Sequence, residues 1–525
     1  MTHRSFLRRL LTGTVLAGTT LLAATNLSAQ TRGGTAVIVI DSDPETLNAA
    51  ITTGNAPGDI GAKLFEGLVW VDPDYKPQPS LATQWTVSQD QKTYTFTLRR
   101  GVKWHDGRDF SSADVKFTYD EALAKLHPRT QTTLRRLAPE IETPDANTVV
   151  FKLKETYAPF INIQTPFEAP MIPRHVYAGS DIKANTANEK PIGTGPFKFA
   201  EWNRGQAVRL VRNDAYWEAG KPYLDALVFQ IIPQGPNRST ALETGEVDFL
   251  YQFYVSRPDV KRLADNNRIQ AKRGSATPAV YFLMMNTARP ALATKEARQA
   301  LATAINRDLQ VAQAMDGHAR PGYGAFGDGF PWLVNADAAY AKKYPLDPSK
   351  AKALLDQAKV APNTTLNLVF DPARPMFNAG GQIIRDNLRQ VGLNVNLVPL
   401  ERSVMIQKVF TERDFDLTLQ SFSSSGDPSI GYHRIYLTNE TRAQFLNASG
   451  YSNKAVDDLL GQAATAADQA TRARLYREAQ GILNEDVPTL VLYDEVGTDL
   501  ASRKLNGLWK GVDGRDRWSE VWMTR

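Results

Sequence analysis

The sequence predicts an α/β protein built from two or three domains. From Ala279 onward, strand-like and helix-like segments alternate, beginning with a continuous apolar run at 279–285 that suits a strand covered on both faces. The chain between 73 and 189 instead carries mostly strand patterns, such as the period-2 alternation at 94–98. Because 525 residues are too many for one hydrophobic core, the two patterns indicate different domains.

The first residues match the three-part pattern of a secretory signal peptide. Arg4, Arg8 and Arg9 form a basic start, an apolar stretch runs from about Leu10 to Ala24, and a small residue, Ala29, offers the cleavage point. The apolar stretch is too short and too polar for the roughly 20 residues that span a bilayer core. We therefore expect a signal peptide at 1–29 and a periplasmic protein, with the Sec and twin-arginine export routes both open.

Composition narrows the classes of partner. The 61 Lys and Arg residues nearly balance 56 Asp and Glu residues, so neither nucleic acid nor an acidic membrane surface is an expected partner. No later segment has membrane-spanning length, which predicts a soluble mature chain. The absence of cysteine excludes a disulfide framework in an exported protein, so stability must come from ordinary burial.

Proline- and glycine-rich breaks suggest that one domain is inserted into another. Three prolines between 73 and 79 mark the first boundary, and the PIGTGPFKF segment at 191–199 returns the chain to the first domain. The strand expected at 489–493 would return it again, giving two crossings, near Ala276 and near Pro488. The expected boundaries are 30–71, 190–277 and 488–525 for the first domain, 72–189 for the insertion and 278–487 for the last domain.

The exact residue order of one segment, KTYTFTLRRGVKWHDG at 92–107, is far more informative than its composition. It reads as a strand, a turn at Arg100-Gly101 and a compact turn at 104–107, followed by the helix-capping pair Ser111 and Asp114. The literal order resembles the diagnostic segment of the family 5 extracytoplasmic solute-binding proteins, the oligopeptide, dipeptide and nickel receptors of ABC importers. Other typical stretches occur in the right order, at 191–199, 212–225, 240–250, 296–308, 347–355 and 385–395.

The resemblance implies a two-lobed α/β periplasmic binding protein (type II, cluster C-like). Lobe one would combine the first domain with the strand-rich insertion, and lobe two would be 278–487. The lobes would close on a peptide or a similar amide- or carboxylate-bearing solute and deliver it to an inner-membrane permease with its cytoplasmic ATPase. No cofactor, catalytic residue or covalent step is expected, and a monomer is the expected state.

The segment 421–428 is the first candidate for ligand contact, because it follows the strand expected at 415–419 and ligands bind at the ends of parallel strands. Peptide-binding relatives carry here an aspartate that pairs with the ligand's α-amino group. That place falls on Ser424, while Asp427 lies three residues later and could instead cap a turn. The segment also contains Phe422 and Ser423. Its cluster of serines suits hydroxyls, amides or a carboxylate better than an ammonium.

Arg374 ends the strand expected at 366–370, where some dipeptide-binding relatives place an arginine for the ligand carboxylate. A guanidinium fork fits that task, although a solvated loop arginine is the alternative. Three further groups could line the pocket: Asn55 in the family's first cleft-facing loop, Tyr254, and the pair Phe326 and Trp332. The aromatic side chains could equally serve plain packing.

Two rival functions remain open. His433 could contact metal in a nickel-chelate receptor, although a surface or packing role is the commoner fate of a lone histidine. An exported hydrolase would need a nucleophile beside a base, and the sequence has no G-x-S-x-G or H-E-x-x-H motif. The literal G-x-G-x-x-G at 322–327 follows Arg320-Pro321 rather than a strand, so it does not indicate a dinucleotide site.

Overall fold

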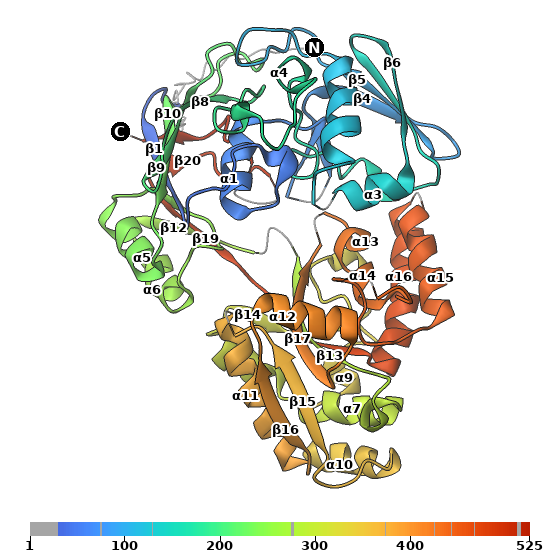
Figure 1. Cartoon of the computed structure of the whole chain (residues 1–525). Helices are drawn as coiled ribbons and strands as arrows, with labels where there is room; N and C mark the ends of the chain where they lie inside the picture. Colours follow the sequence, from blue (N-terminus) through green and yellow to red (C-terminus); the bar gives the residue numbers. More distant parts are fainter. Residues whose placement is uncertain are drawn as a thin grey trace, which may run out of the picture.

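The computed structural model describes residues 30–524 except 74–75, 129, 275–277, 373, 425, 443, 467 and 512–515. It consists of two lobes, one above the other in Figure 1. The expected signal peptide at 1–29 and the crossing expected near Ala276 lie outside the described residues. In the described part of the chain, no helix combines the length and the apolar character needed to cross a membrane.

A seven-stranded sheet forms the core of lobe one. Its order is β12-β19-β11-β1-β10-β9-β8. The central strand β1 runs parallel to β10 and β11, while the flanking strands pair antiparallel. The strands are β1 (Thr35–Ile40), β8 (Phe197–Asn203), β9 (Ala207–Arg212), β10 (Ala226–Ile231), β11 (Phe249–Leu250), β12 (Ile269–Arg273) and β19 (Thr498–Ser502). Helices α1 (Asn55–Leu64), α5 (Gly235–Thr244) and α6 (Val260–Ala264) belong to this lobe.

The insertion forms a four-stranded antiparallel sheet of order β4-β5-β7-β6. Alternating residues of β5 are buried, as its period-2 pattern predicts. The capping box also forms, because the Ser111 backbone N–H donates to the Asp114 carboxylate at 2.9 Å. The elements are β4 (Ala82–Val87), β5 (Thr93–Leu98), β6 (Glu140–Asp145), β7 (Thr148–Lys152), α2 (Ser112–Phe117), α3 (Thr130–Leu137), α4 (Arg174–Tyr177) and the 3₁₀ turn η3 (Ala158–Phe160).

Lobe two is built on a six-stranded mixed sheet of order β14-β18-β13-β17-β15-β16. Strand β13 is buried along nearly its whole length, as its apolar run predicts. The strands are β13 (Ala279–Met285), β14 (Ala319–Pro321), β15 (Thr365–Phe370), β16 (Asn394–Pro399), β17 (Leu417–Ser423) and β18 (Thr489–Glu495). The longer helices are α7 (Lys295–Ala304), α10 (Pro348–Gln357), α11 (Pro375–Gln390), α15 (Lys454–Thr465) and α16 (Gln469–Asp486).

Further short strands and helices lie in both lobes. In lobe one they are β2 (Val69–Val71), β3 (Pro77–Pro79), β20 (Leu505–Asn506) and β21 (Trp522–Met523). In lobe two they are α8 (Arg307–Leu309), α9 (Tyr340–Lys343), α12 (Arg402–Ile406), α13 (Pro428–Gly431) and α14 (His433–Tyr436). These architectural features confirm the predicted two-lobed α/β fold with a strand-rich insertion.

One strand does not lie where the sequence analysis expects it. Strand β18, expected to return to lobe one, pairs with β13 and β14 in the sheet of lobe two. Six of its seven residues are buried, which suits a position inside a covered sheet. The return to lobe one therefore comes after β18, at the step to β19. There the Gly274 N–H donates to the Gly497 carbonyl at 3.0 Å, tying the two connecting segments together.

The glycine-rich segment at 322–327 has a packing explanation. A Cβ on Gly322 would lie 2.0 Å from the Val491 carbonyl oxygen, and one on Gly327 would lie 1.7 Å from the Asp494 carboxylate. Gly327 also has a φ of +63°, which favours glycine. These glycines allow the segment to pack directly on β18, and no phosphate-binding function is needed to explain them.

Candidate ligand-binding site between the lobes

The carboxyl ends of β15 and β17 bring Arg374 and Ser421 together. The two strands run parallel, so their carboxyl ends meet at the same edge of the sheet. The Arg374 guanidinium donates through Nη1 to the Ser421 hydroxyl at 2.5 Å and lies 5.6 Å from the ring centre of Phe377. Arg374 also precedes the first turn of α11, where the positive end of the helix dipole favours anions. This edge therefore combines donors suited to a carboxylate.

A second cluster beside this edge links the lobes. Tyr281 is the cross-strand neighbour of Ser421 and stacks on Tyr493 with ring centres 4.9 Å apart. Its hydroxyl donates to Glu495 at 2.9 Å, and Glu495 also pairs with Arg257 of lobe one at 3.4 Å. Burial raises the pKa of Tyr281 well above its usual value, so this phenol stays a neutral donor. Sequence reasoning missed this cluster because it depends on the register of β13, β17 and β18.

Several side chains of the segment 421–428 are already engaged in contacts within lobe two. Ser423, at the end of β17, is exposed. Phe422 is buried beneath the Arg434 guanidinium, which lies 4.0 Å from its ring centre. Ser424 is buried, donates to the carbonyl of Asp427 and accepts from the Gly431 N–H at 3.1 Å. Ser424 therefore braces the loop in this conformation.

Asp427 lies inside this loop, only 2 % exposed, and forms a bidentate ion pair with Arg472 at 2.7 and 2.8 Å. The same carboxylate caps α13 by accepting from the Ser429 N–H at 2.9 Å. These contacts match the alternative in which Asp427 caps a turn. A ligand ammonium would have to compete with a buried guanidinium for the Asp427 carboxylate. The partner Arg472 has no sequence signal that links it to Asp427.

The predicted aromatic residues lie in different surroundings. Tyr254 is buried in lobe one and donates to Asp59 at 2.7 Å. Phe326 is fully buried among the rings of three tyrosines in lobe two: Tyr432, Tyr436 and Tyr476. Trp332 is half-buried, its ring centre 5.7 Å from that of Tyr476. Asn55 is exposed at the start of α1.

His433 is engaged within lobe two. Its Nε2 lies 2.9 Å from the Tyr476 hydroxyl, and burial lowers the pKa of the imidazole to about 3. The ring is therefore neutral at physiological pH. Among residues whose positions the structure describes, no cluster of three or more His, Cys, Asp or Glu side chains could hold a metal ion. These contacts match the packing interpretation of His433.

The two lobes, the inserted subdomain and the polar edge between the lobes define a solute-binding protein. Residues 76–443 match the model of the bacterial extracellular solute-binding proteins, family 5 Middle. The chain belongs to this family and is a substrate-binding protein of the ABC importer class. Members of the family are receptors rather than enzymes and work outside the cytoplasm.

Relatives of known ligand resemble the chain over nearly its whole length. The glutathione-binding protein GsiB of Escherichia coli O6:K15:H31 is 28% identical over 518 residues, 97% of this chain and 96% of the relative. Two proteins of solved structure are each 25% identical to this chain in sequence: DppA from Helicobacter pylori in complex with the peptide STSA, and a dipeptide-binding protein from Pseudoalteromonas sp. SM9913 in complex with Met-Leu. Both have a TM-score of 0.77 and cover 94% of this chain, and 99% and 100% of their own chains. The solute-receptor prediction fits these findings better than the nickel-receptor or hydrolase alternatives.

Proposed function

We propose that the protein captures a short peptide, or a similarly sized solute with amide and carboxylate groups, between its two lobes. The observation that carries this proposal is the pair of Arg374 and Ser421 at the meeting carboxyl ends of β15 and β17. A guanidinium, a hydroxyl and a helix start together favour a carboxylate. The ligands of the relatives, glutathione, STSA and Met-Leu, are all peptides and support this class.

The mature protein would work in the periplasm after removal of residues 1–29. It would pass its ligand chemically unaltered to an inner-membrane permease driven by a cytoplasmic ATPase. No enzymatic step is needed for this role. Native mass spectrometry of the purified protein, followed by calorimetric titration with glutathione and with Met-Leu, tests the proposal directly. Recovery of a cleaved peptide, or binding of none of these solutes and no co-purifying molecule, would contradict it.

Replacing Arg374 tests the carboxylate contact. Arg374→Ala should weaken binding of a peptide that the parent protein binds by about 1–3 kcal/mol, because a buried ligand carboxylate would lose its charged partner. The same peptide with an amidated carboxyl terminus should lose much less on this substitution. The measurement is calorimetric titration of both peptides with both proteins.

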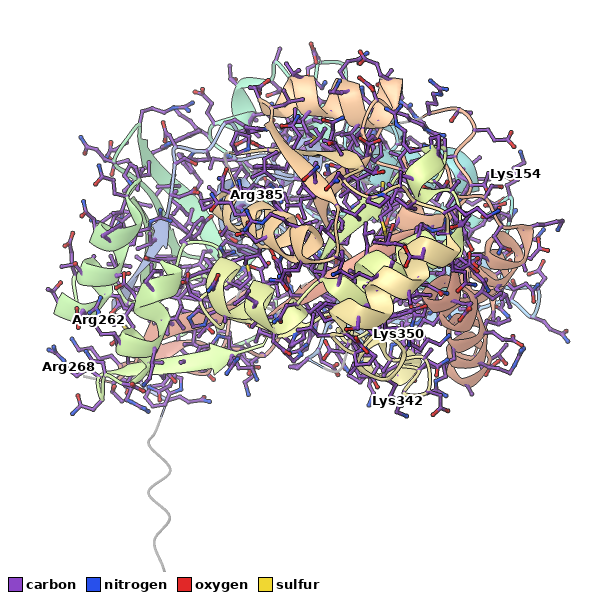
Figure 2. The ribbon with its side chains drawn as sticks, turned by 90° about the horizontal axis from the view of Figure 1, so that it is seen from below. Lys154, Arg262, Arg268, Lys342, Lys350 and Arg385 are labelled. Carbon is purple, nitrogen blue, oxygen red and sulfur yellow. The ribbon has the colours of Figure 1, made fainter. Side chains whose placement is uncertain are left out.

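Arg385→Ala supplies the control for this experiment. Arg385 lies further along α11 and is at the molecular surface, where it pairs with Asp386 at 3.4 Å (Figure 2). Its removal takes away the same charge from a nearby position of the chain without touching the proposed site, so binding should change little. Equal losses in the two variants would remove Arg374 from the site.

A further inference from the structure

A single carboxylate lies at the boundary between the lobes. Glu495 is the last residue of β18 and directly precedes the chain that returns to lobe one. Its Oε2 accepts a hydrogen bond from the Tyr281 hydroxyl of lobe two at 2.9 Å, and its Oε1 accepts one from the Arg257 guanidinium of lobe one at 3.4 Å. The Glu495 and Arg257 side chains are each 27 % exposed, so water and salt screen this ion pair less than a fully exposed one.

Arg257 belongs to the part of lobe one that leads into the other connection between the lobes. It begins the 3₁₀ turn η5 (Arg257–Asp259), which continues into α6 and then into β12. At the end of β12, Arg273 is the cross-strand partner of Thr498 in β19. The two connecting segments are thus held together at lobe one, and the ion pair between Arg257 and Glu495 spans the two lobes beside them.

The Tyr281 side of this contact reaches the proposed ligand edge. The Tyr281 ring stacks on Tyr493 with ring centres 4.9 Å apart and meets the Phe377 ring edge-on at 6.2 Å. Phe377 lies in the first turn of α11, and the Arg374 guanidinium lies 5.6 Å from its ring centre. Packed side chains therefore connect the ligand edge of lobe two to the residue that binds lobe one.

The lobes also meet on the side away from their connecting segments. Ile430 of α13 packs against the hydrophobic core of lobe one, and the turn η3 of the insertion packs against α15. In Figure 1, α3 of the insertion lies above α15 and α16. The ion pair between Arg257 and Glu495 thus forms while the lobes contact each other at both sides, as expected for a closed arrangement.

We propose that Glu495 is a positioning residue that couples the ligand edge to the orientation of the lobes. Tyr281 orients the Glu495 carboxylate from the ligand edge, and the carboxylate in turn holds Arg257, which stabilises the closed arrangement. One carboxylate serves both partners, so a change at either partner affects the other. The inference rests on the proposed function only in treating this edge as the ligand site, because the contact between the lobes forms without a ligand.

Distances between the lobes test this role in the ligand-free protein. The chain has no cysteine, so cysteines introduced at Lys154 and Lys350 can each carry one spin label. Figure 2 shows both side chains at the surface, Lys154 shortly after β7 of the insertion and Lys350 on α10 of lobe two. Double electron–electron resonance then reports the ratio of closed to open populations. Glu495→Gln and Arg257→Gln should each lower this ratio by about threefold, because each removes the ion pair.

Two further variants distinguish positioning from general damage. Arg257→Lys keeps the charge and should retain most of the parent ratio, whereas Arg257→Gln should not. Tyr281→Phe keeps the ring and removes the hydroxyl, and should lower the ratio by about two- to threefold although Tyr281 belongs to lobe two. Adding Tyr281→Phe to Arg257→Gln should change the ratio little further, because the effect of Tyr281 passes through the ion pair.

Arg268→Gln is the matched control. Arg268 is an exposed arginine of lobe one, and its guanidinium donates to the Glu243 carbonyl of the same lobe at 3.2 Å (Figure 2). Its loss removes the same charge from the same lobe and should leave the ratio unchanged. An unchanged ratio in folded Glu495→Gln and Arg257→Gln would overturn the proposal. Fully additive effects of Tyr281→Phe and Arg257→Gln would also overturn it.

Calorimetric titration with a peptide that the parent protein binds separates this inference from the proposed function. If the closed arrangement is the one that holds the ligand, Glu495→Gln should weaken binding by no more than the factor by which the closed population falls, about threefold. A lower closed population in a protein that binds no peptide would support the role of Glu495 between the lobes while contradicting the proposed ligand class.

Discussion

Arg472→Ala is expected to destabilise the protein by about 3–5 kcal/mol, because it leaves the Asp427 carboxylate buried without its partner. The two residues lie in a nearly solvent-free part of lobe two, and each guanidinium nitrogen in the pair binds one carboxylate oxygen at 2.7 or 2.8 Å. The loss should therefore far exceed that of a surface ion pair. Urea unfolding at pH 7, followed by circular dichroism, measures the difference in the free energy of unfolding.

Two comparisons separate the buried charge from general damage. Asp427→Asn combined with Arg472→Met removes both charges, keeps the cap of α13, and should recover much of the lost stability. Lys454→Ala breaks a surface ion pair with Asp458, in which the Lys454 side chain is 86 % exposed. This substitution should lower the free energy of unfolding by less than about 1 kcal/mol. A loss below that level for Arg472→Ala would contradict the assigned role of the pair.

The framework of this fold is readable from sequence because its signals are local. The cap at Ser111 and the buried run of β13 each depend on a few neighbouring residues, and the structure shows both. Local signals do not reveal to which sheet β18 belongs, because a buried strand fits the sheet of either lobe equally well. Only its pairing with β13 decides the question, and that pairing joins residues about two hundred positions apart in sequence.

The same distinction applies to the candidate site. The sequence assigns Arg374 and the loop at 421–428 to strand ends, and the structure brings Arg374 and Ser421 into contact. The sequence does not reveal that Asp427 is already paired with Arg472, because Arg472 lies 45 positions further along the chain. Long-range polar partners decide the roles of these residues.

Asp494→Asn should make the protein markedly less sensitive to pH between about 4 and 8. Asp494 is buried in β18, and burial together with the nearby Asp328 carboxylate raises its pKa from 3.8 to about 8. The Arg320 guanidinium, which pairs with Asp328 at 2.5 Å, opposes this shift only in part. One Asp494 oxygen accepts from the Asp328 N–H at 3.2 Å, and an asparagine carbonyl oxygen can keep that bond.

The sign of the effect follows from proton binding in the two states. Between pH 4 and 8 the folded protein holds a proton on Asp494 that the unfolded chain has lost, so the stability of the parent protein falls as pH rises, by up to about 1.4 kcal/mol per pH unit. Above pH 8 this contribution stays constant. Asparagine is neutral throughout, so Asp494→Asn should gain stability relative to the parent by a few kcal/mol from pH 5 to 8.

Urea unfolding of parent and variant at several pH values between 5 and 9 provides the measurement. Asp414→Asn is the control, because Lys408 and Arg289 lower the pKa of that surface carboxyl in the folded protein. An aspartate in the unfolded chain is also ionised over this range, since its ordinary pKa is about 3.9. Its difference from the parent should stay constant with pH. A constant difference for Asp494→Asn as well would mean that Asp494 is ionised in the folded protein. The glycine-rich segment that covers it would then have to stabilise a buried anion rather than a neutral acid.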